Sequence, residues 1–198
     1  MKKQEVIVRD LRLSEKRLQH TLGVVRACVM LCERHFPEVD PEDAETAALM
    51  HDFTKEYPYE KQMELVRRYG IELTESEKEE PKLLHARTAA ALAKEVYGLP
   101  DHVVNAIRWH TTGKPGMSPL EEALYFADYI EDTRTFPGCV RLREYYEREY
   151  RARKDKRKAL LLGLERSFEV TIRDRMSERK SIDPYTVEAR NYSLGLLK

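Results

Sequence analysis

The sequence predicts an all-α protein folded as one helical bundle. Its 198 residues include only 8 Gly and 9 Pro, so few positions interrupt regular structure. Apolar residues recur three or four positions apart over long stretches, which is the period of a helix with one buried face. No internal repeat or low-complexity linker divides the chain. We therefore expect one domain over residues 1–198, with a core at about 14–135 and C-terminal helices at about 141–198 packed on it.

The first long helix is expected from near Ser14 to about Phe36. Its buried stripe would consist of Leu18, Leu22, Val25, Val29 and Cys32. The next helix starts at Asp40, an N-cap acceptor that precedes Pro41 at the first helical position. It ends at the adjacent pair His51-Asp52, and Tyr57-Pro58 then marks a break.

A further helix is expected over about 82–97, because Gly98 and Pro100 supply a stop signal. Asp101 would cap the following helix, which ends at Trp109-His110 ahead of the loop TTGKPG.

Ser118 and Glu121 form a capping box with Pro119 at the first helical position, and they open the helix EEALYFADYIED. The tail is expected to hold one or two helices between Arg141 and Arg175. A last helix would begin at Pro184.

Composition excludes several classes of protein. The chain has 35 Lys+Arg and 35 Asp+Glu, and this balance argues against an electrostatic grip on nucleic acid. It has no run of 18 apolar residues, and its start, MKKQEVIVRD, lacks the apolar centre of a signal peptide. Three Cys are too few and odd in number for a disulfide framework. We expect a cytoplasmic protein, and read the basic segment 141–158 as a solvated helix with ion pairs.

Residues of the types that bind metals stand at or near the expected helix ends. Imidazole and carboxylate together suit first-row divalent metals such as Fe, Mn or Co better than Mg. An aspartate has two oxygens and can bridge two ions, and a carboxylate left unpaired among apolar helix residues would be costly. The candidates are His20, His51, Asp52, His85, His110 and Asp128.

Each candidate also has an ordinary structural interpretation. His20 lies on an apolar stripe and could be a hydrogen-bonded core histidine. His51 could sit on the helix dipole with Asp52 in the turn behind it, and His85 and His110 could be helix-face residues. Asp128 could pair with an arginine such as Arg134. Singly, none of these residues establishes a site.

Together, however, they follow the order H…HD…H…H…D, and longer motifs surround them. RLQHTLGVV, ALMHDFTKEYP, LLHARTAA, WHTTGKPGMSPLEEALYFADYIEDTR and IDPYTVEARNYSL extend from Arg17 to Leu194. This combination resembles the YqeK family of HD-domain symmetrical bis(5′-nucleosyl)-tetraphosphatases, with every ligand position kept.

The resemblance implies a metal-dependent hydrolase that cleaves diadenosine tetraphosphate into two ADP. Iron would be the metal, with Mn or Co as substitutes, held by His20, His51, Asp52 and Asp128. His85 and His110 would hold a second metal or face the substrate phosphates. Water activated by metal would attack in line beside Asp52.

Cationic residues are expected around the polyphosphate. Lys55 joins Asp52 as an expected catalytic residue, and Arg17, Lys55 and Arg134 are the candidate phosphate clamps, although each could be an ordinary surface or helix-end cation. Ile182, Pro184 and Tyr185 open the last helix and are expected to bind substrate, by phosphate or by base; the alternative is a plain helix start capped by Asp183.

Two other functions stay open at this point. The chain could be another HD phosphohydrolase that acts on nucleotides or alarmones, or a non-catalytic module that binds nucleotides or RNA. For the leading function, the expected partner is a dinucleoside polyphosphate, with no membrane and no nucleic acid, and a homodimer is left open.

Overall fold

The computed structural model describes residues 3–198. Their regular secondary structure consists of helices, with no strand. Short loops join the helices, and a 3₁₀ turn, η1 (Pro81–Leu83), precedes α6. This architecture confirms the all-α prediction. The helices are α1 (Lys3–Asp10), α2 (Glu15–His35), α3 (Pro41–Met50), α4 (Tyr59–Arg68), α5 (Glu75–Glu79), α6 (Leu84–Glu95), α7 (Asp101–Trp109), α8 (Pro119–Ile130), α9 (Pro137–Ala152), α10 (Lys156–Ser177) and α11 (Pro184–Leu196).

Three of the expected helix starts are confirmed by their caps. Ser14 accepts a hydrogen bond from the Arg17 N–H and Asp40 from the Glu42 N–H, while Ser118 and Glu121 form the expected capping box. These side chains satisfy N–H groups that the first helical turn leaves without a partner.

Other boundaries differ from the expectation. Asp101 is the first residue of α7 and Pro100 holds the cap position, so Asp101 acts through its charge in the first turn and not as a cap. The helix expected at 82–97 begins with η1 and runs regularly only over Leu84–Glu95. Gly98 follows it with φ +57°, the left-handed conformation of a helix stop.

Helices α1, α4 and α5 have no counterpart among the expected elements. α4 turns one face inward, with Gln62, Leu65 and Val66 buried. Its many charged residues mask this face in the sequence. The helix forms because these three side chains pack on the rest of the bundle.

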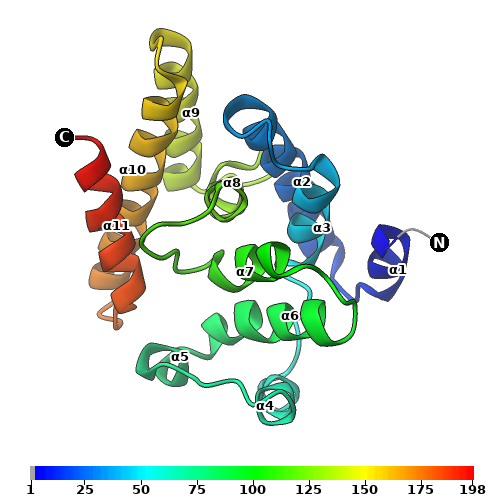
Figure 1. Cartoon of the computed structure of the whole chain (residues 1–198). Coiled ribbons are helices and arrows are strands. Elements are labelled where there is room, and N and C mark those ends of the chain that lie inside the picture. The colour runs from blue at the N-terminus through cyan, green and yellow to red at the C-terminus, as the bar shows by residue number, and fades with distance from the viewer. Residues whose placement is uncertain (1–2) are drawn as a thin grey trace.

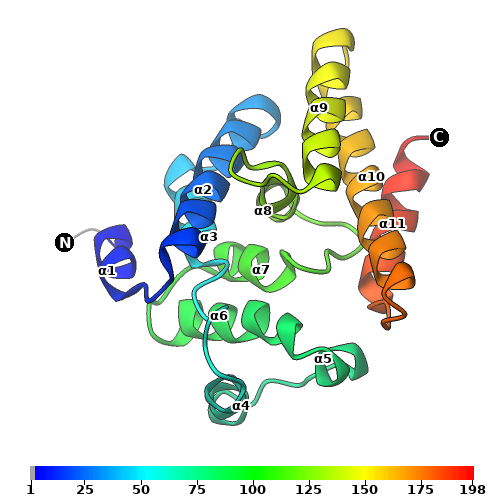
Figure 2. The same ribbon diagram turned by 180° about the vertical axis from the view of Figure 1, so that it is seen from behind.

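Helix α8 forms the centre of the molecule (Figures 1 and 2). It packs against α2, α7, α9 and α10, and its residues from Ala123 to Ala127 have no exposed surface. A helix that is apolar on every side is stable only when neighbours cover all its faces. α8 can therefore hold a polar side chain in a fixed, largely buried position.

The C-terminal helices share this core. Leu142 and Tyr146 of α9 and Leu160 and Phe168 of α10 belong to the same apolar cluster as α8. Gly163 of α10 lies against the Phe126 ring, where a β-carbon would come within 2.5 Å. Close approach at this glycine joins the C-terminal helices to the rest of the bundle.

Two expectations about helix faces need correction. In the expected buried stripe of α2 only Cys32 is fully buried and Leu22 is 37% exposed, because the helix turns the neighbouring face with His20 and Val24 inward. The basic segment 141–158 carries the expected ion pairs, but it is not one helix, since α9 ends at Ala152 and α10 begins at Lys156. No described helix is long and apolar enough to cross a membrane.

Candidate metal centre

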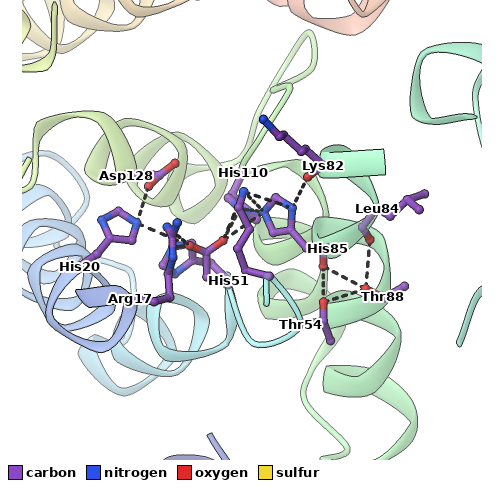
Figure 3. Close-up of polar contacts among 12 residues, drawn as sticks. Arg17, His20, His51, Thr54, Lys82, Leu84, His85, Thr88, His110 and Asp128 are labelled. Atoms are coloured by element: carbon purple, nitrogen blue, oxygen red, sulfur yellow. Dashed lines mark hydrogen bonds and ion pairs between the residues drawn. The ribbon is translucent and has the colours of Figure 1, made fainter. Parts of the chain in front are cut away.

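Six side chains from five helical segments converge in the middle of the bundle (Figure 3). His20 comes from α2 and Asp128 from the last turn of α8. His51 and His110 are the C-terminal cap residues of α3 and α7, and His85 lies in the first turn of α6. All six expected ligands, which include Asp52, are thus brought together.

Asp52 lies between two groups of histidines. Its Oδ2 is 3.4 Å from His51 Nε2 and 3.6 Å from His20 Nε2. Its Oδ1 is 3.1 Å from His85 Nε2 and 4.0 Å from His110 Nε2. Each group forms a compact set of ligand atoms with Asp52. The carboxylate is therefore placed to serve two ions, one at each oxygen.

All four histidines turn their Nε2 atoms inward because Nδ1 is already engaged. A main-chain carbonyl only accepts hydrogen bonds, so an Nδ1 that contacts one must carry the ring proton, and Nε2 then presents its lone pair. The Nδ1 partners are Ala48 O for His51 (2.6 Å), Lys82 O for His85 (2.5 Å), Ile107 O for His110 (2.7 Å) and the Glu131 carboxylate for His20 (3.0 Å).

The donor set fits a divalent metal ion. His51 Nε2 is buried and has no hydrogen-bond partner within the described chain, a condition that is rare for buried polar atoms. Beside it, His20 Nε2 faces the carboxylate of Asp128 at 3.0 Å. An ion between the two Nε2 atoms and the carboxylates of Asp52 and Asp128 would be bound by all four groups. Imidazole and carboxylate together favour a first-row transition metal.

Asp52 reaches this position because the chain departs from the helix after Met50. α3 ends there, His51 caps it, and residues 52–57 form a turn in which the Lys55 N–H donates to Asp52 O. The Thr54 hydroxyl donates to His85 O at 3.0 Å and contacts the Thr88 hydroxyl at 2.7 Å (Figure 3). This buried contact fixes the turn on α6.

Charges and burial around the cluster favour the metal-binding forms of Asp52, Asp128 and His110. Burial raises the pKa of Asp52, but the neighbouring histidines His51 and His85 outweigh it and hold this pKa well below its ordinary value. Asp128 is similar: burial is outweighed by Arg134 and His20, and its pKa also lies well below the ordinary value. Burial lowers the pKa of His110 well below its ordinary value, so its ring is neutral.

The surroundings of His20 attract positive charge. Burial lowers the pKa of this histidine, but the carboxylates of Asp128 and Glu131 outweigh the effect and raise the pKa to about 9. A divalent cation would be drawn to the same place.

Three cationic side chains border the cluster. Arg17 Nη1 lies 2.7 Å from Asp52 Oδ2, and Arg134 Nη2 lies 2.6 Å from Asp128 Oδ1. The Lys55 ammonium lies 3.2 Å from His85 Nε2, and burial lowers the pKa of Lys55. Each of the three candidate phosphate clamps therefore contacts a candidate metal ligand. The ion pair between Asp128 and Arg134, considered from the sequence as an alternative to metal binding, is also present.

The first turn of α11 lies beside His110 and outside the group of six candidate ligands. Tyr185 packs on Trp109, with ring centroids 4.8 Å apart, and the Thr186 hydroxyl donates to Thr112 O. These contacts bracket His110. Asp183 accepts a hydrogen bond from the Tyr185 N–H, so this N–H is already used by the helix cap. Ile182 and Pro184 flank Asp183 in the chain. Neither residue contacts the six candidate metal ligands through any hydrogen bond or ion pair of the described residues.

The expectation from sequence missed Glu131. This carboxylate is 1% exposed, and besides His20 it binds the Thr133 N–H and hydroxyl at 2.7 and 2.8 Å. Gly23 makes room for it, since a β-carbon there would lie 2.2 Å from Glu131 Oε2. In the sequence, Glu131 is visible only as the last residue of the motif ADYIE. No local pattern indicates that it contacts His20, which lies 111 positions earlier.

Comparisons with known proteins agree with this arrangement. The family model described as HD domain matches residues 17–133. A protein from Bacillus subtilis named symmetrical bis(5′-nucleosyl)-tetraphosphatase is 38% identical over 137 residues, which cover 69% of this chain and 72% of that protein. A protein of the same name from Staphylococcus aureus is 36% identical, over 67% of this chain and 68% of its own.

A solved structure agrees over nearly the whole chain. It is a protein from Clostridium acetobutylicum described as a predicted HD superfamily hydrolase involved in NAD metabolism. The match has a TM-score of 0.85 at 37% sequence identity and covers 99% of each chain.

Proposed function

The chain belongs to the HD-domain family, and on that basis we propose that it is a metal-dependent hydrolase that cleaves diadenosine tetraphosphate symmetrically into two ADP. The observation that carries the proposal is the Asp52 carboxylate, which has two inward-facing histidine Nε2 atoms at each of its oxygens. Relatives of matching length carry the name of this activity.

His20, His51, Asp52 and Asp128 are the proposed ligands of the more tightly held metal, with iron as the metal and Mn or Co as substitutes. His85 and His110 would hold a second ion or contact substrate phosphates. When bound, the metal supplies Lewis acidity and lowers the pKa of coordinated water.

Asp52 and Lys55 are the proposed catalytic residues. Asp52 would orient the attacking water by accepting its hydrogen bond, because both carboxylate oxygens face the interior of the site. Lys55 would hold a proton next to the leaving ADP. Its ammonium lies on the His85 side of Asp52, and burial lowers its pKa, which favours release of the proton.

Arg17 and Arg134 are the proposed clamps for the non-reacting phosphates. Each uses one nitrogen on a ligand carboxylate and keeps further N–H donors for phosphate oxygens. Arg134 Nε has no hydrogen-bond partner in the described chain. At the other side of the site, Ile182, Pro184 and Tyr185 are proposed to line one nucleoside pocket, since Tyr185 packs on Trp109 next to His110.

The test is product analysis. The protein would be purified without oxygen, supplied with iron or manganese, and incubated with diadenosine tetraphosphate, and the products would be separated by chromatography. ADP as the sole product is expected, with at least a hundredfold loss in Asp52→Asn. Asp132→Asn, at an exposed position, is the matched control and should keep full activity.

Other results would point to the alternatives. ATP plus AMP would contradict symmetrical cleavage. Turnover of other nucleotides or alarmones alone would favour another HD phosphohydrolase, and binding without turnover would favour the non-catalytic module.

The remaining parts of the proposal concern the whole protein. We propose one domain over residues 1–198, which the core shared by α8, α9 and α10 supports, and a cytoplasmic location, which the unpaired Cys28, Cys32 and Cys139 support. A homodimer is a separate proposal, which a measurement of the protein's mass in solution would test.

A further inference from the structure

A cavity of about 550 Å³ opens beside His20. Its walls come from the first turns of α2 and from the loop that joins α8 to α9. Lys16, Arg17 and Gln19 line one wall, and Arg134 and Phe136 line the other, with His20 between them. The volume falls within the range of pockets that hold small molecules. Because His20 is a proposed metal ligand, the cavity adjoins the proposed metal centre.

Phe136 is the apolar surface of this cavity. Its side chain is 64% exposed, which is unusual for a phenylalanine, and none of the described aromatic rings packs on it. Pro137 follows it as the first residue of α9, so the backbone that carries the ring is well defined. An exposed ring beside a charged site offers a stacking surface for a base.

The cavity is lined by three cations and two carboxylates. Glu131 is already bound by His20 and Thr133, and Glu15 lies in the first turn of α2. Arg17 and Arg134 lie next to the carboxylates of Asp52 and Asp128. Lys16 makes no ion pair within the described residues and faces the same cavity. Cations near the metal and an aromatic ring farther away match the order of phosphates and base along a nucleotide.

We propose that this cavity binds the second nucleoside of a dinucleoside polyphosphate, with its base stacked on Phe136 and its phosphates on Arg17 and Arg134. The inference rests on the proposed function. Cleavage at the middle of a symmetrical substrate needs a holding site on each side of the reacting phosphates. One end lies beyond His110, near Tyr185, and this cavity supplies the other end, beyond His20.

A neighbouring cavity of about 630 Å³ between α8, α9 and α10 is the competing location. It shares Arg134 and Phe136 but contains no proposed metal ligand. One of its cations, Arg173, is paired with Glu169. Since only the cavity beside His20 is lined by a proposed metal ligand, it is the better match.

The first test compares two substrates with wild type and Phe136→Ala. Diadenosine tetraphosphate has a nucleoside at each end, whereas adenosine 5′-tetraphosphate has one, which can occupy the site near Tyr185. Loss of base stacking should raise KM for the first substrate at least about fivefold and leave KM for the second within about twofold. Phe136→Trp should restore the wild-type KM.

The second test does not depend on turnover. Isothermal titration calorimetry with ADP should give two sites per chain in wild type and one in Phe136→Ala. Tyr59→Ala removes another half-exposed ring, on α4, and should keep both sites.

Equal effects of Phe136→Ala on both substrates, or no effect on either, would overturn the inference. Arg166 lines only the neighbouring cavity and Lys16 only the cavity beside His20. Loss of the second ADP site in Arg166→Ala but not in Lys16→Ala would also overturn the inference, because it would place the nucleoside in the neighbouring cavity. Failure of the proposed function looks different. In that case wild type fails to hydrolyse diadenosine tetraphosphate at all, and the ADP stoichiometry still decides whether the cavity binds a nucleotide.

Discussion

At the scale of single residues, the metal centre depends on how each histidine ring is held. Three rings donate Nδ1–H to a carbonyl three positions earlier in the chain, so the local helix end or turn fixes their direction. His20 differs, because it lies inside α2, where carbonyls are used by the helix. Its Nδ1 partner is the Glu131 carboxylate, 111 positions away.

We therefore predict that Glu131→Gln weakens metal binding without removing a ligand. The amide cannot supply the negative charge that orients the ring and raises its basicity, and loss of such a partner typically costs about 10- to 100-fold in metal affinity. Competitive titration with a chelator would measure the change. Asp132→Asn, its exposed neighbour, should leave metal affinity unaltered, and an unchanged affinity in Glu131→Gln would contradict the role given to this carboxylate.

Gly23→Ala should produce a related defect by a steric route. The new β-carbon would lie 2.2 Å from Glu131 Oε2, so the carboxylate must move away from His20. We expect weaker metal binding and a loss of stability of about 1–3 kcal/mol, as for other overpacked sites. Gly195→Ala, in α11 with open space around it, is the control and should be neutral or slightly stabilising. Equal behaviour of the two variants would show that the site near Gly23 relaxes freely.

At the scale of helices, the contact between α2 and α9 should make stability sensitive to acid. His35 Nε2 lies 2.8 Å from the Tyr146 hydroxyl. Burial, with help from Arg157 and Arg34, lowers the pKa of His35 to about 4. The folded protein therefore keeps this ring neutral at pH values at which the unfolded chain, with a pKa near 6.5, is already protonated.

The resulting prediction has a definite sign. Stability contributed by neutral His35 is complete above about pH 6.5 and is lost as the pH falls towards 4. Between pH 7 and pH 5, wild type should lose about 1 kcal/mol more than His35→Gln, after allowance for solvent screening at this half-buried position. Urea denaturation at the two pH values measures this difference, and parallel losses in both proteins would refute it.

At the scale of the whole molecule, the centre connects α2, α3, α6, α7 and α8 through six side chains. A metal that binds only the folded arrangement must stabilise all of these helices together. With free metal at 100 times its dissociation constant, the gain is about 2.7 kcal/mol, or a rise in Tm of roughly 5–10 °C for a chain of this size.

Thermal unfolding with and without Mn²⁺ would check this expectation, with Asp52→Asn as the matched variant. Asp52 contacts both groups of histidines, so the variant should lose most of the metal-dependent shift. A similar shift in wild type and in the variant would place the stabilising metal elsewhere.

Much of the architecture was accessible from sequence because its signals are local. Ser14, Asp40 and Ser118 mark helix starts through contacts with residues two or three positions away. The central helix α8 could be predicted because a capping box is followed by a run of mostly apolar residues. α4 was missed because only three of its residues are buried and most of the others are charged. Asp101 was misjudged by one position because proline and aspartate both favour a helix start.

The sequence by itself determined the helical class, several helix starts and which side chains are the candidate metal ligands, because these depend on neighbours and on the order of residue types. Only the tertiary structure decided which oxygen of Asp52 faces which histidines, that Glu131 orients His20, and that Phe136 stands exposed beside the centre. Those relations join residues far apart in the chain, such as His20 and Glu131 or Arg17 and Asp52. The packing of the helices sets such distances, and no short-range pattern encodes them.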